Sequence, residues 1–217
     1  GRWDNVAAWT YLALHGGYGL LWVLKSRWFG DAQWEKPCTL SQGLSLWVAL
    51  SLYWIAPWIL CSRDVRPSAA WIGACIATWG FGVFFHFVAD MQKDCWMKLQ
   101  RGRLLTEGMW SRLRNPNYFG ELLIYVGFSA LALHPLPLAA LAAMVLGVWV
   151  PNMRRKDASL SRYPEFVDFA LSLPSHLLLS PLGETKRVLR HHVDTQISRR
   201  IARSKRRCAT SLHEVWK

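Results

Sequence analysis

Charged side chains gather in residues 89–101, where a long apolar stretch gives way to a polar segment. If a helix continues through this segment, a rotation of about 100° per residue places Asp90, Asp94 and Arg101 within roughly 40° of one another. In one interpretation this stripe is a solvated helix face, stabilised by opposite charges four residues apart. In the other interpretation it is the polar wall of a site for a cofactor that carries ribose or phosphate.

Glu121 lies in the first turns of an otherwise uncharged stretch that follows Asn115 and Pro116. Helix capping explains Asn115 and Pro116, because Asn is a preferred N-cap and Pro suits the first helical position. Capping does not explain Glu121. An ionisable group at membrane depth is costly and usually functional, and Arg114 is the nearest cation in the sequence. Glu121 is therefore a candidate site residue.

These residues must be positioned by four uncharged stretches, which are residues 5–24, 37–62, 67–89 and 122–153. A helix needs about 20 apolar residues to cross a bilayer. The first three stretches therefore predict one span each, at 6–24, 44–61 and 69–89. The fourth has 32 residues and is interrupted by Pro135 and Pro137. It predicts a tight helical hairpin with helices at 118–133 and 136–150.

The predicted fold is an all-α integral membrane protein with about five transmembrane helices, the last two forming the hairpin. A soluble helical protein with a large core is disfavoured by three stretches of span length. A hydrophobic content of 52% excludes a disordered chain. Five scattered cysteines argue against a disulfide framework. No grouping of His and Cys has the spacing of a metal site, so we expect no metal.

The basic residues predict an orientation in the membrane. With five crossings, 25–43, 90–117 and the C-terminal region share one side, which carries 23 of the 26 Lys and Arg residues. The positive-inside rule places this side in the cytosol or in a matrix-like or stroma-like compartment. The chain begins at Gly1 rather than Met, which fits either a cleaved targeting segment or an incomplete N-terminus.

The chain divides into a transmembrane helical domain at 1–150, a polar cap at 151–182 and a basic tail at 183–217. In the tail an apolar residue recurs every four positions among basic residues, at Leu189, Val193, Ile197 and Ile201. This pattern predicts a basic amphipathic helix. It lies beside anionic lipid head groups in one interpretation and on an acidic partner subunit in another. Nucleic acid is not expected as a partner, because aromatic residues are not interleaved with the basic ones.

The run Arg114-Asn-Pro-Asn-Tyr-Phe-Gly-Glu121 resembles the Arg-His-Pro-Asn-Tyr-x-Gly-Glu signature of a membrane superfamily. Its members include steroid 5-alpha-reductases, C14 sterol reductases, isoprenylcysteine carboxyl methyltransferases and phospholipid methyltransferases. Upstream, Asp90-x-Gln92-Lys93 and Gly108-x-Trp110 resemble the reductase branch, as does 155–164 downstream. The resemblance covers roughly 70–182 and is nearest to the steroid 5-alpha-reductase-like branch.

The resemblance implies an oxidoreductase that transfers hydride from NADPH to a carbon–carbon double bond of a lipid-like substrate, while a proton donor completes the addition. The positions that match the family's cofactor contacts are Asp90, Asp94, Arg101, Arg114, Asn117, Tyr118, Glu121, Asn152 and Tyr163. The last two belong to the cap, which closes over the cofactor. The resemblance assigns no catalytic residue, and Glu35 and Tyr53 are candidates only by their place in the sequence.

Two alternatives to the reductase stay open. In the methyltransferase branch the same pocket holds S-adenosylmethionine, although Lys156-Asp157 stands where that branch tends to carry a Glu pair. The other alternative is a non-catalytic accessory subunit of a larger membrane complex. Asn115 in place of the signature His favours this alternative, as does the long basic tail. His15, among glycines in the first span, is either a helix-packing residue or the lining of a functional cavity.

Overall fold

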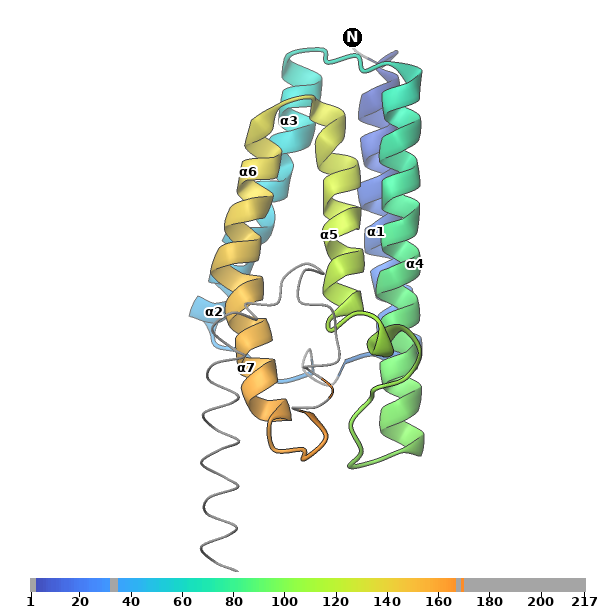
Figure 1. Ribbon diagram of the computed structural model, residues 1–217. Coiled ribbons are helices and arrows are strands. Elements are labelled where there is room, and N and C mark those ends of the chain that lie inside the picture. Colours follow the sequence, from blue (N-terminus) through green and yellow to red (C-terminus); the bar gives the residue numbers. More distant parts are fainter. Residues whose placement is uncertain (1–2, 32–34, 167–168, 170–217) are drawn as a thin grey trace, which may run out of the picture. The chain divides into compact units, whose positions relative to one another are not determined.

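Figure 1 shows the computed structural model, which describes residues 3–31, 35–166 and 169. The chain divides into two compact units, Gly1–Leu160 and Ser161–Lys217. In the first unit the described residues form helices and turns, and they contain no strand. The all-α class is therefore confirmed. The basic tail lies outside the described residues, as do residues 167–168 and 170–182 of the predicted cap.

The first long helix, α1, runs from Val6 to Phe29. Its N-terminus is capped by Asn5, whose side chain accepts a hydrogen bond from the backbone N–H of Ala8 at 3.0 Å. The Asn5 amide also donates to Asp64 Oδ1 at 3.0 Å and to the Val65 carbonyl at 3.1 Å. Asn5 thereby ties the start of α1 to the loop that precedes α4.

The second helical segment consists of α2 (Leu40–Ser51), the 3-10 turn η1 (Leu52–Trp54) and α3 (Ile55–Ser62). It begins with a capping box, in which the side chains of Thr39 and Gln42 each bond the other's backbone N–H. The third segment is α4, from Ala69 to Leu99, and it is followed by the short turn η2 (Gly108–Ser111).

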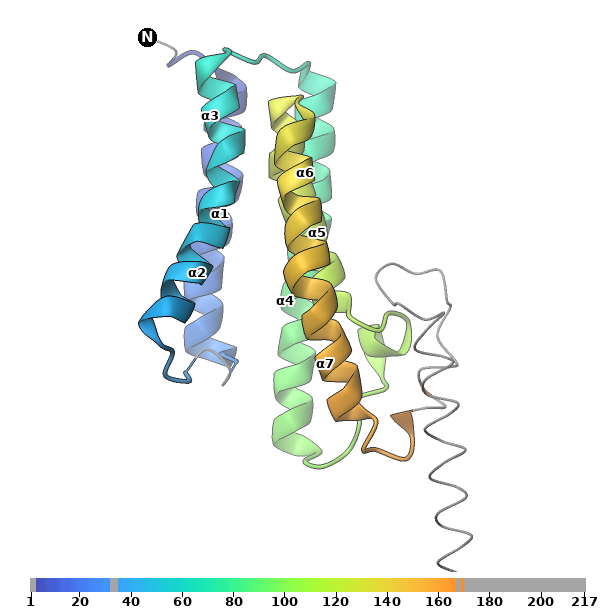
Figure 2. The same ribbon diagram turned by 90° about the vertical axis from the view of Figure 1, so that its left-hand side faces the viewer.

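The last two segments are joined by a sharp turn. Helix α5 (Pro116–Ser129) continues into the 3-10 turn η3 (Ala130–Ala132). The chain then reverses through Leu133, whose φ is +46°, and through His134, whose Nδ1 accepts from the Leu136 N–H and caps the next helix. That helix comprises α6 (Pro135–Met144), the π-helical turn η4 (Val145–Trp149) and α7 (Val150–Leu160). Figures 1 and 2 show α5 and α6 side by side.

Three helical segments among the described residues are long and apolar enough to cross a membrane: Leu40–Ser62, Ala69–Leu99 and Pro135–Leu160. The segment Pro135–Leu160 passes without a break through position 151, where the predicted cap begins. Many large apolar side chains on these helices are exposed, such as Trp58 at 74%. So large an exposed apolar surface fits a lipid environment, and the chain is an integral membrane protein.

Helices α4 and α5 approach closely through glycines. A Cβ atom on Gly82 would lie 2.6 Å from the Ile124 backbone nitrogen and 2.7 Å from the Gly120 carbonyl oxygen. A Cβ on Gly120 would meet the Gly82 carbonyl oxygen at 2.7 Å. Small residues at this interface let the two backbones touch, as is common between membrane helices. The contact fixes the distance between side chains on the two helices, including those of the candidate site.

Candidate functional site

Three helices meet at the carboxylate of Asp90. Lys25 of α1 forms an ion pair with it, and Asn117 Nδ2 of α5 donates to its Oδ1 at 3.1 Å. The side chains of Lys25 and Asp90 are only 10% and 13% exposed. The sequence did not predict a site role for Lys25, because it follows directly after the predicted first span and resembles an ordinary flanking cation. In the structure α1 continues to Phe29, which places Lys25 inside the bundle.

His86, one helical turn before Asp90, completes this polar cluster. Its Nδ1 lies 3.1 Å from the carbonyl oxygen of Asn117, which can only accept, so Nδ1 carries the proton. Its Nε2 is 3.8 Å from Asp90 Oδ2, which is too long for a hydrogen bond. Within the described residues, His86 Nε2 and Asn117 Oδ1 are buried and have no hydrogen-bond partner. Buried polar atoms normally have partners, so these two atoms indicate space for a polar ligand group or water.

Glu121 is held by hydroxyl groups. Tyr18 of α1 and Tyr125 of α5 both donate to its Oε1, at 3.4 and 3.3 Å. Both tyrosines are buried. The sequence pointed to Arg114 as the nearest cation, but Arg114 binds elsewhere. The two tyrosines were missed because a Tyr within an apolar span usually indicates packing or an interfacial anchor.

Arg114 pairs with Asp157 of α7. Arg114 Nε donates to Asp157 Oδ1 at 3.2 Å, and Arg114 Nη2 lies 2.9 Å from the same oxygen. Both side chains are buried. Beside this pair, Lys156 Nζ donates to Asn115 Oδ1 at 2.9 Å and lies 4.4 Å from the centre of the Trp110 ring. Asn115 occupies the N-cap position of α5 but makes no side-chain capping bond. These contacts fasten α7 to the segment before α5.

The segment before α5 is also locked onto α4. Gln92 Nε2 donates to the Glu107 carbonyl at 2.9 Å, and its Oε1 accepts from the Met109 N–H at 3.2 Å. Trp110 Nε1 donates to the Ala89 carbonyl at 3.2 Å. Gly108 has φ +59°, a conformation that favours glycine. The motif positions Gln92, Gly108 and Trp110 thus have a structural task, which is to place Arg114 and Asn115.

A pocket of about 230 Å³ opens beside the polar cluster. Its lining alternates in charge, with Lys25, Lys93, Lys98, Asp31, Asp90 and Asp94 beside Phe29, Gly30 and Met97. Lys93 pairs with Asp31 at 2.8 Å, and Lys98 pairs with Asp94 at 2.7 Å. The pocket therefore presents both hydrogen-bond donors and acceptors. The four side chains in these two ion pairs already have an opposite charge beside them.

Of the other predicted site residues, Tyr118 packs its ring 5.6 Å from that of Trp149. The prediction that Arg101 shares a stripe with Asp90 and Asp94 is wrong. Helix α4 ends at Leu99 because Gln100 leaves the helical conformation, with φ −126° and ψ 51°. Arg101 consequently lies exposed in the turn that follows.

Of the two cap residues of the predicted site, one lies on α7 and the other in the second compact unit. Asn152 is partly exposed on α7, and its Oδ1 lies 3.5 Å from Arg155 Nη1. Tyr163 belongs to the second compact unit, where the Arg162 guanidinium lies 5.1 Å from its ring.

The two catalytic candidates lie in different environments. Glu35 is exposed, whereas Tyr53 is buried and its ring is stacked on that of Tyr125, with the ring centres 4.5 Å apart.

A comparison with protein families gives one match. The model of a family described as "Protein of unknown function (DUF1295)" matches residues 31–156. The match covers more than half of the chain and includes Asp90, Arg114, Asn117 and Glu121. No curated protein and no solved structure matches the chain.

Proposed function

The chain belongs to the DUF1295 family, a family of steroid 5-alpha-reductase-like membrane proteins, and on that premise we propose that it is an NADPH-dependent reductase of a carbon–carbon double bond in a lipid. The observation that carries the proposal is the partly buried carboxyl group of Glu121, which is bonded by the hydroxyls of the buried Tyr18 and Tyr125. Reduction of a double bond needs a proton donor within the bundle, and a carboxyl group with two hydroxyls is a unit that can hold and deliver one.

The polar cluster around Asp90 is the proposed cofactor site. Its two unpartnered buried atoms, His86 Nε2 and Asn117 Oδ1, have hydrogen-bonding capacity that a ligand amide or hydroxyl would satisfy. Arg101 and the neighbouring Arg103 are exposed and suit a phosphate. The residues present therefore fit a phosphorylated nucleotide. When bound, NADPH supplies a hydride.

Side chains of the protein itself hold the polar cluster in a fixed geometry. Lys25 and Asn117 fix the Asp90 carboxylate from two neighbouring helices, so the carboxylate does not have to reorganise when a ligand arrives. The surrounding helices present apolar surface, which suits an apolar substrate. The proton unit at Glu121 lies one helical turn from Asn117 along α5, so the cofactor site and the proton donor share one helix.

We further propose five membrane crossings, with α1 and α5 added to the three segments of span length. The basic ends of the helices then face the cytosol or an equivalent compartment. Cys61 and Cys95 test this arrangement, because both thiols are exposed and they lie near opposite ends of the helices. An impermeant maleimide added to sealed vesicles should label only one of the two. Labelling of both from the same side would contradict the topology.

The reductase proposal is tested with the purified full chain in lipid nanodiscs. NADPH binding is followed by energy transfer from tryptophan, and turnover by loss of NADPH absorbance with a steroid enone as probe substrate. Glu121→Gln and Tyr125→Phe should lower turnover by about 100-fold or more, the contribution typical of general acid catalysis. Their effect on NADPH binding should be small, since neither variant changes the cluster at Asp90.

The matched control is Glu107→Gln, because Glu107 is an exposed carboxylate on the loop before η2. It should leave turnover unchanged. If Glu121→Gln and Glu107→Gln turn over at the same rate as wild type, Glu121 is not part of a proton unit. If the folded wild type binds S-adenosylmethionine and not NADPH, the protein is a methyltransferase, acting on a lipid or a prenylcysteine.

A second candidate function is that of an accessory subunit without catalysis. The observation that favours it is that two cations at the candidate site are neutralised within the chain: Lys25 pairs with the largely buried Asp90, and Arg114 pairs with the buried Asp157. Such pairs serve the fold without any ligand. This alternative predicts that a well-folded chain binds neither cofactor, and that it is recovered from native membranes in a stable complex with other subunits, in contact with acidic partners or anionic lipids.

A further inference from the structure

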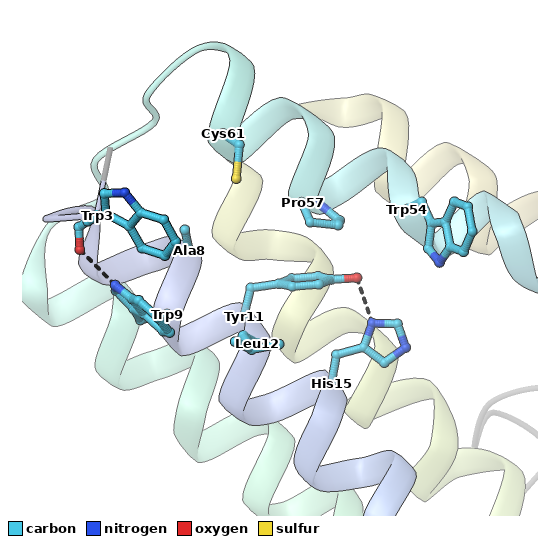
Figure 3. Close-up of a pocket in the computed structure, with 9 residues that line it drawn as sticks. All are labelled: Trp3, Ala8, Trp9, Tyr11, Leu12, His15, Trp54, Pro57 and Cys61. Atoms are coloured by element: carbon cyan, nitrogen blue, oxygen red, sulfur yellow. Dashed lines mark hydrogen bonds between the residues drawn. The ribbon is translucent and has the colours of Figure 1, made fainter. Parts of the chain in front are cut away.

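A second pocket lies away from the polar cluster, between α1 and the segment from Trp54 to Cys61 (Figure 3). Its volume is about 440 Å³, within the range of small-molecule sites, which is roughly 300–1,000 Å³. It is lined by Trp3, Ala8, Trp9, Tyr11, Leu12, His15, Trp54, Pro57 and Cys61. None of these residues carries a permanent charge. Figure 3 shows Trp3 and Trp9 toward one end of the pocket and His15 with Trp54 toward the other.

The hydrogen bonds of Tyr11 fix the proton on His15. The Tyr11 hydroxyl lies 2.9 Å from the carbonyl oxygen of Tyr53, and a carbonyl can only accept. The single hydroxyl proton is therefore used in that bond. The same oxygen lies 2.7 Å from His15 Nδ1, so it must accept a hydrogen bond from this nitrogen, which therefore carries the proton. In a neutral imidazole with Nδ1 protonated, Nε2 is a bare acceptor.

The acceptor is held in place by the rings around it. The His15 imidazole stacks on Phe128, with centroids 4.7 Å apart and an angle of 7° between the planes. Tyr11 meets it edge-on at 5.3 Å, and Tyr53 at 6.3 Å. Among the described residues, no hydrogen bond or ion pair involves His15 Nε2. The pocket thus combines apolar and aromatic walls with one fixed acceptor.

We propose that this pocket binds an uncharged lipid alcohol, whose hydroxyl donates to His15 Nε2 and whose hydrocarbon part lies against the tryptophan rings. A charged lipid head group would be left without a counter-charge in this lining, which is costly. A ketone of the same shape would direct its lone pairs toward the lone pair of Nε2. The pocket therefore selects a hydroxyl over a carbonyl. The proposal does not depend on the reductase function, because it involves none of the residues of the polar cluster.

Cys61 provides a local readout, because its exposed thiol lines the pocket. The full chain in detergent is treated with a maleimide in the presence of 2-tetradecanol or of 2-tetradecanone, which share one carbon skeleton. Labelling at each cysteine is quantified by mass spectrometry. The alcohol should slow labelling of Cys61 at a concentration about 2- to 12-fold lower than the ketone does, the ratio that one net hydrogen bond provides. Cys38 and Cys95, which are exposed elsewhere, are internal controls.

His15→Phe keeps an aromatic ring on Phe128 and removes the acceptor. In this variant the alcohol and the ketone should protect Cys61 equally. The proposal is overturned if wild type does not distinguish the alcohol from the ketone, if neither protects Cys61, or if Cys38 and Cys95 are slowed as much as Cys61. The comparison of the two ligands on wild type decides the matter even if His15→Phe does not fold.

Discussion

Replacing Gly82 by Ala tests whether the close contact of α4 and α5 holds the site together. The new Cβ would lie 2.6 Å from the Ile124 nitrogen and 2.7 Å from the Gly120 carbonyl oxygen, both backbone atoms that cannot rotate away. Overpacking of this kind costs about 1–3 kcal/mol. Ala also gains about 0.8–1.0 kcal/mol over Gly in helix propensity. A measurement on one variant alone would mix the two effects.

Gly80→Ala separates these effects, because Gly80 lies on the same helix and a Cβ there meets nothing within 4 Å. The difference between the two variants should be about 1–3 kcal/mol, with Gly82→Ala the less stable. Thermal unfolding in one detergent, followed by tryptophan fluorescence, measures this difference. Since the helices must separate, NADPH affinity should also fall in Gly82→Ala and not in Gly80→Ala. Equal unfolding temperatures would refute the close contact and the positioning argument built on it.

Three further predictions concern single contacts. Arg114→Ala should cost about 3–5 kcal/mol, because it leaves Asp157 buried without its cation, and Arg114→Met with Asp157→Leu should restore most of the loss in a thermal unfolding assay. The hydrogen bond from Arg66 holds the pKa of the exposed Asp4 below its usual value. The stability that this hydrogen bond contributes is therefore present above the unfolded pKa of Asp4, near pH 4, and is lost as the pH falls through the folded pKa. Arg66→Ala should raise the pKa of Asp4 in an NMR titration. Leu133→Gly should raise the free energy of unfolding by up to about 1 kcal/mol, because a left-handed conformation strains a leucine. A higher unfolding temperature in the thermal assay would show this gain.

The sequence predicted the helical architecture well because long uncharged stretches leave few alternatives. The stretch 67–89 became the apolar part of α4, and the stretches 37–62 and 122–153 each contain most of a helical segment that is long enough to cross a membrane. Helix ends were less predictable. Helices α1 and α4 continue for several residues past the predicted spans, because charged residues such as Lys25 and Asp90 neutralise each other inside the bundle instead of ending the apolar segment.

The candidate site was only partly predictable. Asp90 and Asn117 do come together, although they are 27 positions apart, and the family resemblance pointed to both. Lys25 and Tyr18 were missed, because contacts from α1 depend on how three helices pack, which no local pattern encodes. Arg114 was interpreted as the cation nearest to Glu121, but it pairs with Asp157, because proximity in the sequence gives no information on the packing of α7.

Glu121 is the residue whose presence the fold explains least. Lys25 with Asp90 and Arg114 with Asp157 are neutralised pairs that clamp helices together, whereas no Lys or Arg in the described part of the chain forms an ion pair with Glu121. A carboxylate held only by hydroxyls within an apolar bundle is costly to the folded state. If the chain is an accessory subunit, Glu121→Gln should leave stability unchanged or raise it and have no other effect. If the chain is a reductase, the same variant should keep or gain stability and lose turnover, the trade-off expected of a functional site. Measuring unfolding temperature and NADPH consumption on one preparation separates these outcomes, and a large loss of stability would contradict both by giving Glu121 a structural role.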